Sequence, residues 1–455
     1  MTREARAETT RSPQVLRGMR DFLPQQMLLR QEIVDRFKAV FERFGFEPID
    51  TPLLEYYEVL AGQYGEEGEK LMYHFQDHGG REVGLRYDLT VPLARFVAAH
   101  RHELTFPFKR YHIGPVFRAE RPQRGRYRQF WQCDVDTVGT RSMLADAEVL
   151  LVWIEALDSV NVPNVVIQVN HRKLLQALAT HAGVPAEQAL LVYRAIDKLE
   201  KIGPEGVREE LLRHGVSELA ARAVLDLVQL RGEPAPVLAE VRERLAGDPQ
   251  AMEAVAELEE LFRYLGLLGA DPRRYALNLA LARGLDYYTG PVFEAVVEEP
   301  AIGSLGGAGR YDGLIGMFLG EDIPATGGSL GLERVVEVVQ ELQLLHAPST
   351  VTQALVTVFD DESWGVALGL VQELRAGGVA AEVYLGERRD LRRQVQYADR
   401  KGVPLVLFCG PDELAAGVVT IRELASGEQH RVARADLVSE VRRLLAARDP
   451  RSATN

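Results

Sequence analysis

The stretch from 171 to 269 carries a helical pattern, whereas the chain before and after it carries strand signals. Its apolar residues recur at helical steps, and prolines and glycines divide it into successive amphipathic helices. One such stripe consists of Ala220, Ala223, Val224, Leu227 and Leu230. Because β-signals and motif-like glycines are nearly absent from it, we expect a helical insertion at 171–269 within one domain formed by 13–170 and 270–345.

Strand-like runs lie on both sides of this insertion, with helical stripes among them. The runs occupy 108–113, 130–138, 275–281 and 292–297, and 46–55 is a further run interrupted by Pro48 and Pro52. Helices are expected at 27–41, 143–157 and 332–342. The varied connections between the strands indicate a mainly antiparallel sheet flanked by helices, and therefore an α+β multidomain fold.

A separate unit is expected at 350–447, after a linker at 346–350. Short buried strands at 351–359, 380–385 and 404–408 alternate with helical stretches at 364–375 and 390–401. This alternation is typical of a small α/β domain with a partly parallel sheet.

The composition narrows the class of protein. A chain of 455 residues is too long for one ordinary core, so about two to four domains are expected. No apolar run approaches the roughly 18 residues needed to cross a bilayer, and 1–12, expected to be a mobile arm, lacks the apolar core of a secretory signal. Cys133 and Cys409 lack metal-ligand spacing, so we expect neither a disulfide nor a zinc site, as suits a reducing cytoplasm.

The net charge of −13 argues against non-specific nucleic-acid binding. It leaves room for an RNA partner, because affinity for phosphate depends on local basic patches.

An arginine-rich segment at 117–136 is the first candidate site. Its arginines surround Pro122 and Gly125, and the aromatic residues Tyr127, Phe130 and Trp131 are interleaved with or follow them. A solvated hairpin with charged edges would explain such arginines. A nucleotide site would explain them together with the aromatics, since arginine binds phosphate bidentately and an aromatic face stacks on a purine. The arginines are Arg118, Arg121, Arg124, Arg126 and Arg128.

The second candidate segment, 281–294, places Arg283, Tyr287 and Tyr288 among apolar and small residues, just before a glycine-rich stretch at 303–318. A glycine-rich bend with a packed tyrosine pair is the structural alternative to a ligand site. A phosphate loop is excluded because the required lysine and hydroxyl ending is missing. Arg334 follows early in a helix and would, by itself, be an ordinary surface arginine.

Five segments occur in the order seen in histidyl-tRNA synthetases, a family of class II aminoacyl-tRNA synthetases. They read RGMRDFLP, LRYDLTVPLARF, FRAERPQRGRYRQF, LARGLDYYTG and GLERV. Residues 391–424 resemble the family's anticodon-binding domain, so the likeness spans about 13–445. The resemblance implies a class II synthetase-like sheet and a histidine–tRNA ligase reaction. Histidine would be activated with ATP to histidyl-adenylate plus pyrophosphate and then transferred to the 3′ end of tRNA(His).

The resemblance also implies roles for residues that match the family's motifs. The catalytic residues would be Arg118, Arg283 and Arg334, which offset the charge that develops as two anions meet. Arg283 would partly replace a metal ion used by other class II enzymes, and Mg²⁺ would be bound only through the ATP phosphates. The ATP-binding residues would be Arg118, Glu120, Arg126, Phe130 and Arg334.

Histidine would be bound through its amino group and its imidazole. Asp88, Thr90 and Gln132 resemble the amino-group binders, while Asp136 and Tyr288 would accept from and donate to the ring nitrogens, with Tyr287 and Tyr311 nearby. Rejection of isosteric amino acids would follow from the polar groups left unmatched. The full histidine-binding set is Asp88, Thr90, Gln132, Asp136, Arg283, Tyr287, Tyr288 and Tyr311.

Transfer RNA would touch two regions. Gln123, Arg124 and Arg128 belong to the loop that approaches the acceptor end in this family. A basic patch in the last domain falls near one helical face, although a plain solvated helix would also explain it. It comprises Arg389, Arg392, Arg393 and Arg400, with Tyr397 as a candidate for base stacking. The family resemblance further implies a homodimer with an interface around 37–54 and no membrane partner.

The sequence departs from the family pattern at two positions. Trp131 and Ala308 replace commoner residues, and Trp131 could reshape the adjoining histidine pocket.

Two rival functions remain. The main rival is a non-catalytic relative, the regulatory subunit of ATP phosphoribosyltransferase, which usually lacks the anticodon-binding domain and the arginine–tyrosine–tyrosine motif. The other is an RNA-binding regulator that kept the fold and lost the chemistry.

Overall fold

The computed structural model describes residues 12–185, 188–282, 287–387 and 390–448 of the chain. Contacts divide the chain into two compact units, one formed by 1–21 with 33–345 and the other by 22–32 with 346–455. Within the described ranges, no helix combines the length and the apolar character needed to span a membrane.

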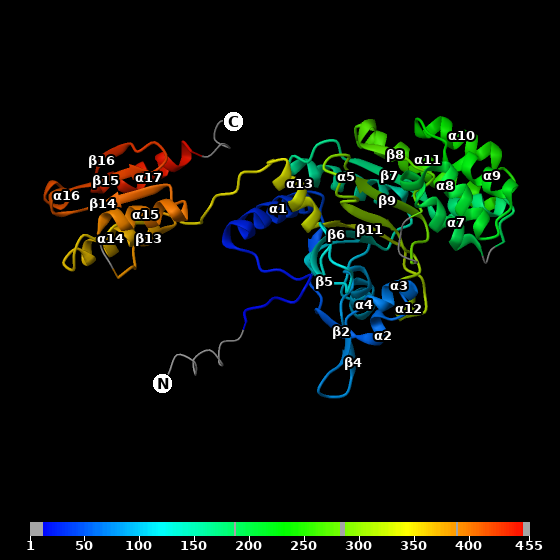
Figure 1. The fold of residues 1–455 in the computed structure, drawn as a ribbon, viewed down its shortest axis with the longest axis horizontal. Coiled ribbons are helices and arrows are strands. Elements are labelled where there is room, and N and C mark those ends of the chain that lie inside the picture. Colours follow the sequence, from blue (N-terminus) through cyan, green and yellow to red (C-terminus); the bar gives the residue numbers. More distant parts are fainter. Residues whose placement is uncertain (1–11, 186–187, 283–286, 388–389, 449–455) are drawn as a thin grey trace. The chain divides into compact units, whose positions relative to one another are not determined.

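An eight-stranded sheet forms the centre of the first unit (Figure 1). Six consecutive strands are antiparallel, and a short parallel strand lies at each edge. The expected antiparallel sheet flanked by helices is therefore confirmed. In spatial order the strands are β1 (Glu47–Pro48), β5 (Phe108–Phe117), β6 (Gln129–Val138), β11 (Ala325–Gly331), β10 (Gly306–Arg310), β9 (Pro291–Val296), β7 (Val166–His171) and β8 (Tyr275–Leu277).

The predicted run at 46–55 is divided between two sheets. Glu47–Pro48 joins the central sheet, whereas Leu54–Tyr56 (β2) pairs with β4 (Glu82–Leu85) in a small sheet that ends with β3 (His74–Gln76). Two prolines in this run explain the division, because proline cannot donate a ladder hydrogen bond.

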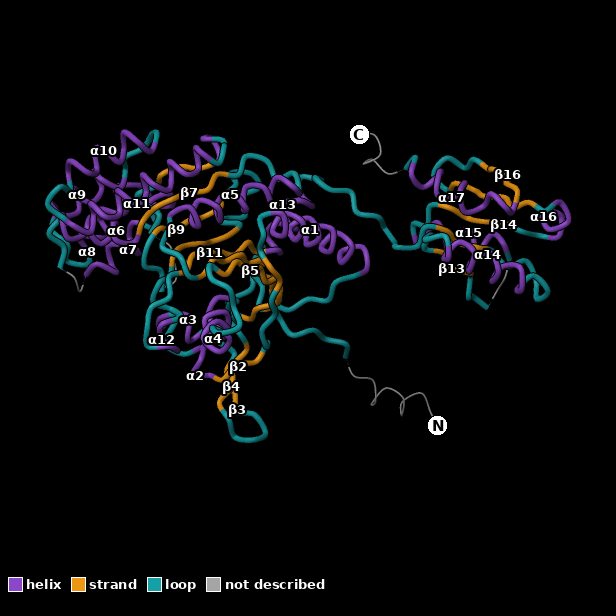
Figure 2. The backbone as a smooth tube through the Cα atoms, turned by 180° about the vertical axis from the view of Figure 1, so that it is seen from behind, coloured by secondary structure: helices purple, strands orange, loops and turns teal. Residues whose placement is uncertain are grey.

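Helices cover both faces of the central sheet (Figure 2). The expected helices at 27–41, 143–157 and 332–342 are confirmed as α1 (Pro24–Arg43), α5 (Met143–Ser159) and α13 (Leu332–Glu341). Trp153 of α5 is fully buried, and its ring lies where side chains at Gly306 and Gly328 would be, so α5 packs closely on these strands. Outside the segment 171–269, the other described α-helices of the first unit are α2 (Tyr57–Leu60), α3 (Gly65–Lys70), α4 (Thr90–His100) and α12 (Gly316–Leu319).

The segment after β7 is helical, as its apolar spacing predicted. Its helices gather beside the β7–β8 edge of the sheet (Figure 1). His171 caps the first of them, and its Nε2 lies 2.5 Å from Glu257 on the last. They are α6 (Arg172–His181), α7 (Ala189–Ile196), α8 (Leu199–Arg213), α9 (Glu218–Val228), α10 (Pro234–Arg244) and α11 (Pro249–Leu267).

The second unit contains a five-stranded mixed sheet. β12 is parallel to β13 and β14, as the alternating pattern predicted, while β15 and β16 form an added antiparallel hairpin. β16 is an edge strand with no buried residue, which explains why its pattern was not recognised. The elements are β12 (Ala354–Val356), α14 (Trp364–Ala376), β13 (Ala381–Val383), α15 (Leu391–Lys401), β14 (Leu405–Phe408), α16 (Pro411–Ala416), β15 (Val418–Glu423), β16 (Gln429–Ala433) and α17 (Leu437–Ala446).

Candidate active site

A cavity of about 580 Å³ lies on the central sheet of the first unit. Its wall combines β6, β10 and β11 with the 118–127 loop and the starts of α4 and α13. Cations gather in one part of its lining, and buried acidic and phenolic groups in another. Most of the described candidate residues line it, namely Asp88, Thr90, Arg118, Glu120, Arg126, Phe130, Gln132, Tyr287, Tyr288, Tyr311 and Arg334.

Arg118 is held between two aromatic rings. Its guanidinium carbon lies 4.3 Å from the ring centre of Tyr87 and 5.1 Å from that of Phe130. Its Nε donates to the Tyr87 carbonyl at 3.1 Å. Stacking and one hydrogen bond therefore restrict the guanidinium plane, which is the preorganisation that a phosphate-binding arginine needs.

The loop after Arg118 is tied to α13. Arg334 donates from Nε to the Gly125 carbonyl at 3.4 Å and from Nη1 to the Ser304 carbonyl. Gly125 has a φ of 68°, a conformation that glycine adopts without steric cost. Arg126 forms an ion pair with Glu120 at 3.4 Å. The cationic part of the cavity is thus assembled from a loop and a helix about two hundred residues apart in sequence.

Asp88 occupies the acidic part of the cavity. Its Oδ1 accepts hydrogen bonds from the Thr90 and Val91 amides, both at 3.1 Å, and from the Tyr64 hydroxyl at 3.0 Å. The Tyr287 hydroxyl donates to Oδ2 at 3.4 Å. Burial raises the pKa of Asp88, while the amide donors and Arg118 oppose this shift. A carboxylate held in this way can match one ammonium group.

Three tyrosines form the remaining wall of this part. The Tyr287 ring packs edge-on against Tyr288, at 4.9 Å between centres, and against Tyr311, at 5.9 Å. A side chain at Gly309 would lie 2.7 Å from the Tyr288 ring, so glycine there leaves room for the tyrosine. Burial raises the pKa of Tyr288 and of Tyr311, so both hydroxyls remain protonated donors at neutral pH.

Asp136 does not belong to the cavity lining, although the sequence analysis expected it to contact the ligand. It lies behind Tyr311, whose hydroxyl donates to Asp136 Oδ1. A side chain at Gly327 would collide with the same carboxylate at 2.1 Å. Asp136 therefore reaches the cavity through the tyrosine.

The two departures from the family pattern lie away from the cavity. Phe130 and Gln132 line it, and Trp131 between them does not, because successive residues of a strand face opposite sides. Ala308 lies on the α5 side, since a side chain at its cross-strand partner Gly328 would meet both Ala308 and Trp153. Trp131 therefore does not line the histidine pocket, and its effect on that pocket stays a prediction.

Several residues that the sequence analysis missed contribute to this region. Ser329 accepts from Gln132 Nε2 at 2.8 Å, and Glu333 accepts from the Trp131 amide at 2.8 Å. Tyr64 holds Asp88, and Arg110 lies beneath Asp136. Strand alternation in 325–331 could have indicated Ser329. The others are brought in by tertiary contacts that have no local signal.

The comparisons with known proteins agree with this geometry. Residues 18–335 match the family model of histidyl-tRNA synthetase, and 353–444 match an anticodon binding domain. The chain is 45% identical to a histidine–tRNA ligase of Aeropyrum pernix over 441 residues, which are 95% of this chain and 98% of that protein. This chain belongs to the histidyl-tRNA synthetase family. The resemblance inferred from its motifs is confirmed.

Solved structures extend the match. A crystal structure of histidyl-tRNA synthetase from Nostoc sp. PCC 7120 is 35% identical, with a TM-score of 0.85, and the match covers 96% of this chain and all 100% of that one. A second structure is described as an ATP phosphoribosyltransferase regulatory subunit/histidyl-tRNA synthetase from Bacillus halodurans C. It is 26% identical with a TM-score of 0.72, and the match covers 88% of this chain and 98% of that one. Both carry the fold of this family.

Two of the expected residues, Arg283 and Arg389, lie outside the described residues. The acceptor-end candidates lie beside the cavity and hold the loop together. Arg128 donates to the backbone carbonyls of Glu120 and Arg17, each at 3.2 Å. Gln123 forms a tight turn by exchanging backbone hydrogen bonds with Arg126. Arg124 pairs with Glu337 and Glu341 on α13.

A cavity of about 740 Å³ in the second unit separates the candidates on α15. Arg392 lines it together with Arg422 and the aromatic rings of Phe359 and Phe408. Arg393 instead pairs with Asp390 at 3.0 Å. Both rings are partly buried, and Asp412 and Glu413 line the same cavity. Cations next to accessible aromatic rings are features that bind single-stranded nucleic acid.

The other two candidates on α15, Tyr397 and Arg400, make contacts within the second unit. The Tyr397 ring packs edge-on against Tyr384 at 5.4 Å, and the Arg400 Nε donates to the Gln396 carbonyl at 3.4 Å. Neither belongs to the lining of the cavity that contains Arg392.

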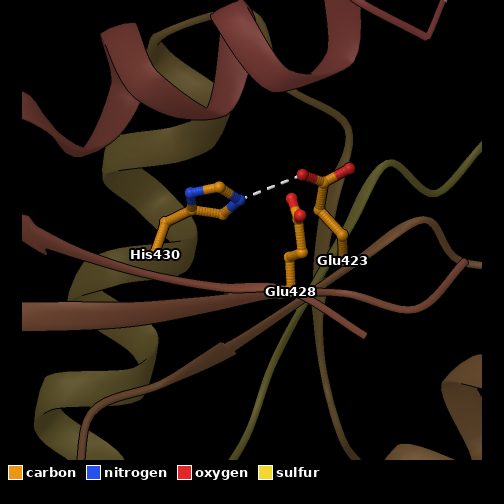
Figure 3. Close-up of side chains that lie close together, drawn as sticks. All are labelled: Glu423, Glu428 and His430. Atoms are coloured by element: carbon orange, nitrogen blue, oxygen red, sulfur yellow. Dashed lines mark hydrogen bonds and ion pairs between the residues drawn. The ribbon is translucent and has the colours of Figure 1, made fainter. Parts of the chain in front are cut away.

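In the part of the chain that the structure describes, one group of three side chains has spacing that suits a metal ion (Figure 3). Glu423, Glu428 and His430 lie on the β15–β16 hairpin, with their ligand atoms within 4.8 Å of one another. His430 Nε2 is already 3.0 Å from Glu423 Oε1, and Arg448 approaches the other oxygen at 3.9 Å. These ion pairs account for the positions of Glu423 and His430, and neither of them includes Glu428.

Proposed function

We propose that this chain is a histidine–tRNA ligase that forms histidyl-adenylate from histidine and ATP and then transfers histidine to tRNA(His). The observation that carries the proposal is one cavity lined by Arg118, Arg126 and Arg334 as well as by Asp88 and a set of tyrosines. The cations suit a triphosphate, while the buried acid and the phenols suit a small amino acid with one ammonium group and a polar ring.

In the activation step, the histidine carboxylate attacks the α-phosphorus of ATP, a bond forms between them, and pyrophosphate leaves. Arg118, already fixed between Tyr87 and Phe130, would stabilise the charge that develops on the phosphoryl oxygens. Arg126 would bind the terminal phosphates, and Phe130 with Arg334 would hold the adenine, whose edge Glu120 would help to read. Arg283 is assigned to the α-phosphate and carboxylate by the family resemblance alone.

Mg²⁺ is proposed to be held mainly by the ATP phosphates, whose charge it offsets. The residues present fit such an ion, because the carboxylate of Glu294 lines the same cavity and oxygen ligands are those that Mg²⁺ prefers.

Histidine selection is proposed to rest on Asp88, Thr90 and Gln132 for the amino group and on Tyr288 and Tyr311 for the imidazole. Asp136 would act by orienting Tyr311, which its carboxylate contacts. An amino acid of similar size without ring nitrogens would leave these buried polar groups unpaired, and such groups discriminate strongly.

For tRNA, we propose that 350–447 binds the anticodon region through Arg392 and Arg422 at the cavity that they line. Arg393 would add charge on the same helix, Arg389 is assigned to tRNA by the sequence alone, and Gln123 and Arg128 would shape the loop that meets the acceptor end. We propose that 13–170 and 270–345 form the catalytic domain and that 171–269 is an insertion in it. We further propose that the protein is a homodimer and works in the cytoplasm.

Histidine-dependent exchange of pyrophosphate into ATP tests the proposal. We expect exchange with histidine and no other standard amino acid, together with charging of tRNA(His). The regulatory-subunit alternative, suggested by the description of the Bacillus halodurans relative, predicts histidine binding without exchange. Folded protein that binds histidine and gives no exchange would establish that alternative and refute the ligase.

A further inference from the structure

Beneath the acidic part of the cavity, one fully buried arginine joins three elements. Arg110 of β5 lies directly opposite Asp136 of β6, and its side chain is 0% exposed. Its Nη2 is 2.6 Å from Asp136 Oδ2 and 3.9 Å from Asp134 Oδ2. The same nitrogen donates to the Leu89 carbonyl at 3.4 Å, next to Asp88 at the start of α4.

Asp136 connects this arginine to the cavity wall. The Tyr311 hydroxyl donates to Asp136 Oδ1, and the opposite carboxylate oxygen is the one that Arg110 approaches. Tyr311 lines the cavity, whereas Arg110 and Asp136 do not. A change in the position or charge of Asp136 is therefore passed to the Tyr311 hydroxyl.

We infer that Arg110 is a positioning residue for histidine binding, which orients the Asp136–Tyr311 pair toward the imidazole ring. The inference rests on the proposed function, because it assigns a ligand to the tyrosine part of the cavity. Arg110 touches neither substrate. It acts by keeping one of two neighbouring carboxylates in place as a charged acceptor.

The charges around Asp136 give the physical reason. Burial raises the pKa of Asp136, and Arg110 is the largest influence that lowers it. Without the guanidinium, burial would raise the pKa of Asp136 further, and the carboxyl in its protonated form would lose an acceptor site for Tyr311. The titratable and charged groups that face this region from all sides are Asp88, Arg110, His112, Asp134, Tyr288 and Tyr311.

A purely structural role for Arg110 is the competing explanation, and the chain offers a matched control. Arg310 of β10 is also buried, at 3% exposed, and pairs with the fully buried Asp146 of α5. It does not line the cavity. Loss of either guanidinium leaves a buried carboxylate unpaired and should destabilise the fold. Only the loss of the Arg110 guanidinium should change the KM for histidine.

The test compares Arg110→Met with Arg310→Met in the full-length protein, using pyrophosphate exchange and thermal unfolding. We expect R110M to raise the KM for histidine by about 10–100-fold, the scale of a charged hydrogen bond, with the KM for ATP changed by less than about twofold. R310M should lower Tm with little change in either KM. Equal effects of R110M on both substrates, or none on histidine, would overturn the inference.

Two further readouts separate positioning from stability. The histidine defect of R110M, relative to wild type, should shrink as pH rises, because a carboxyl whose pKa is raised regains its charge at higher pH. In Asp136→Asn, adding R110M should raise the histidine KM little further, since both changes act on one group. Full additivity or a pH-independent defect would count against the inference.

The conservative variant Arg110→Lys keeps the result decisive if R110M does not fold. An ammonium in the wrong position should give an intermediate rise in the histidine KM with ATP unaffected, and an unchanged histidine KM would overturn the inference. Failure of the wild-type protein to exchange pyrophosphate would refute the proposed function instead. The two failures are therefore distinguishable.

Discussion

Asp134 and Asp136 lie two residues apart on β6 and compete for one arginine. Arg110 Nη2 is nearer to Asp136 than to Asp134, at 2.6 Å against 3.9 Å. Burial raises the pKa of Asp134 to about 8, and repulsion from Asp136 adds to this shift against the attraction of Arg110. An unfolded aspartate has a pKa of about 4. The folded state therefore binds one more proton between about pH 4 and about pH 8, and the associated stability is lost as pH rises through that range.

Asp134→Asn should remove the part of the pH dependence of stability that comes from protonation of Asp134. The free energy of unfolding of the variant, relative to wild type, is expected to increase from about pH 5 to about pH 8, by about 3–4 kcal/mol. Urea unfolding at both pH values measures it. Asp226→Asn, on the exposed side of α9, should show no such trend. A constant difference between D134N and wild type would contradict the assignment.

At the scale of elements, α15 presents two neighbouring arginines with different surroundings. Asp390 caps the helix by accepting from the Arg393 amide and pairs with the Arg393 side chain. Arg392 instead lines the cavity that contains Phe359 and Phe408. Salt-dependent binding of nucleic acid follows the cations that are available to phosphate.

Arg392→Ala should therefore weaken tRNA charging more than Arg393→Ala. We expect several-fold weaker tRNA binding and a salt dependence reduced by about one phosphate contact for R392A, with pyrophosphate exchange unchanged in both variants. Binding measured at several salt concentrations decides the matter. Similar losses in the two variants would show that α15 contributes only general charge, and a parallel loss of exchange would indicate damage to the fold.

At the scale of the whole molecule, the chain contains two compact units, each with its own core. Cores of this kind can unfold as separate cooperative units. The described residues that line the catalytic cavity belong to the first unit, so ligands of the cavity should stabilise that unit.

Calorimetry of the full chain is expected to show two transitions. Histidine with a non-hydrolysable ATP analogue, at about 100 times its dissociation constant, should stabilise one of them by about 2.7 kcal/mol. Leu370→Ala, in the core of the second unit, should lower the other by about 2–5 kcal/mol. A single transition that both perturbations move would show that the units unfold together.

Local periodicity predicted the helical insertion, the antiparallel sheet and the C-terminal α/β unit, while the family's motifs supplied about half of the residues that line the cavity. These features depend on local periodicity and on short motifs, as in 117–136, where alternation along a strand sets the direction of each side chain. In the same strand, Phe130 and Gln132 line the cavity, and Trp131 between them faces the other side. The exposed pattern of β16 was too weak to recognise.

Only the tertiary structure decided which polar groups lie behind the cavity wall. Arg110, Asp134 and Tyr64 have no motif, and their roles arise from register between strands and from a helix start that approaches them. In the structure Asp136 lies behind Tyr311 rather than in the cavity lining, and Arg392 lines a cavity while Arg393 pairs with Asp390. The physical reason is that burial and pairing depend on neighbours distant in the chain, and these neighbours set the charge of each buried group.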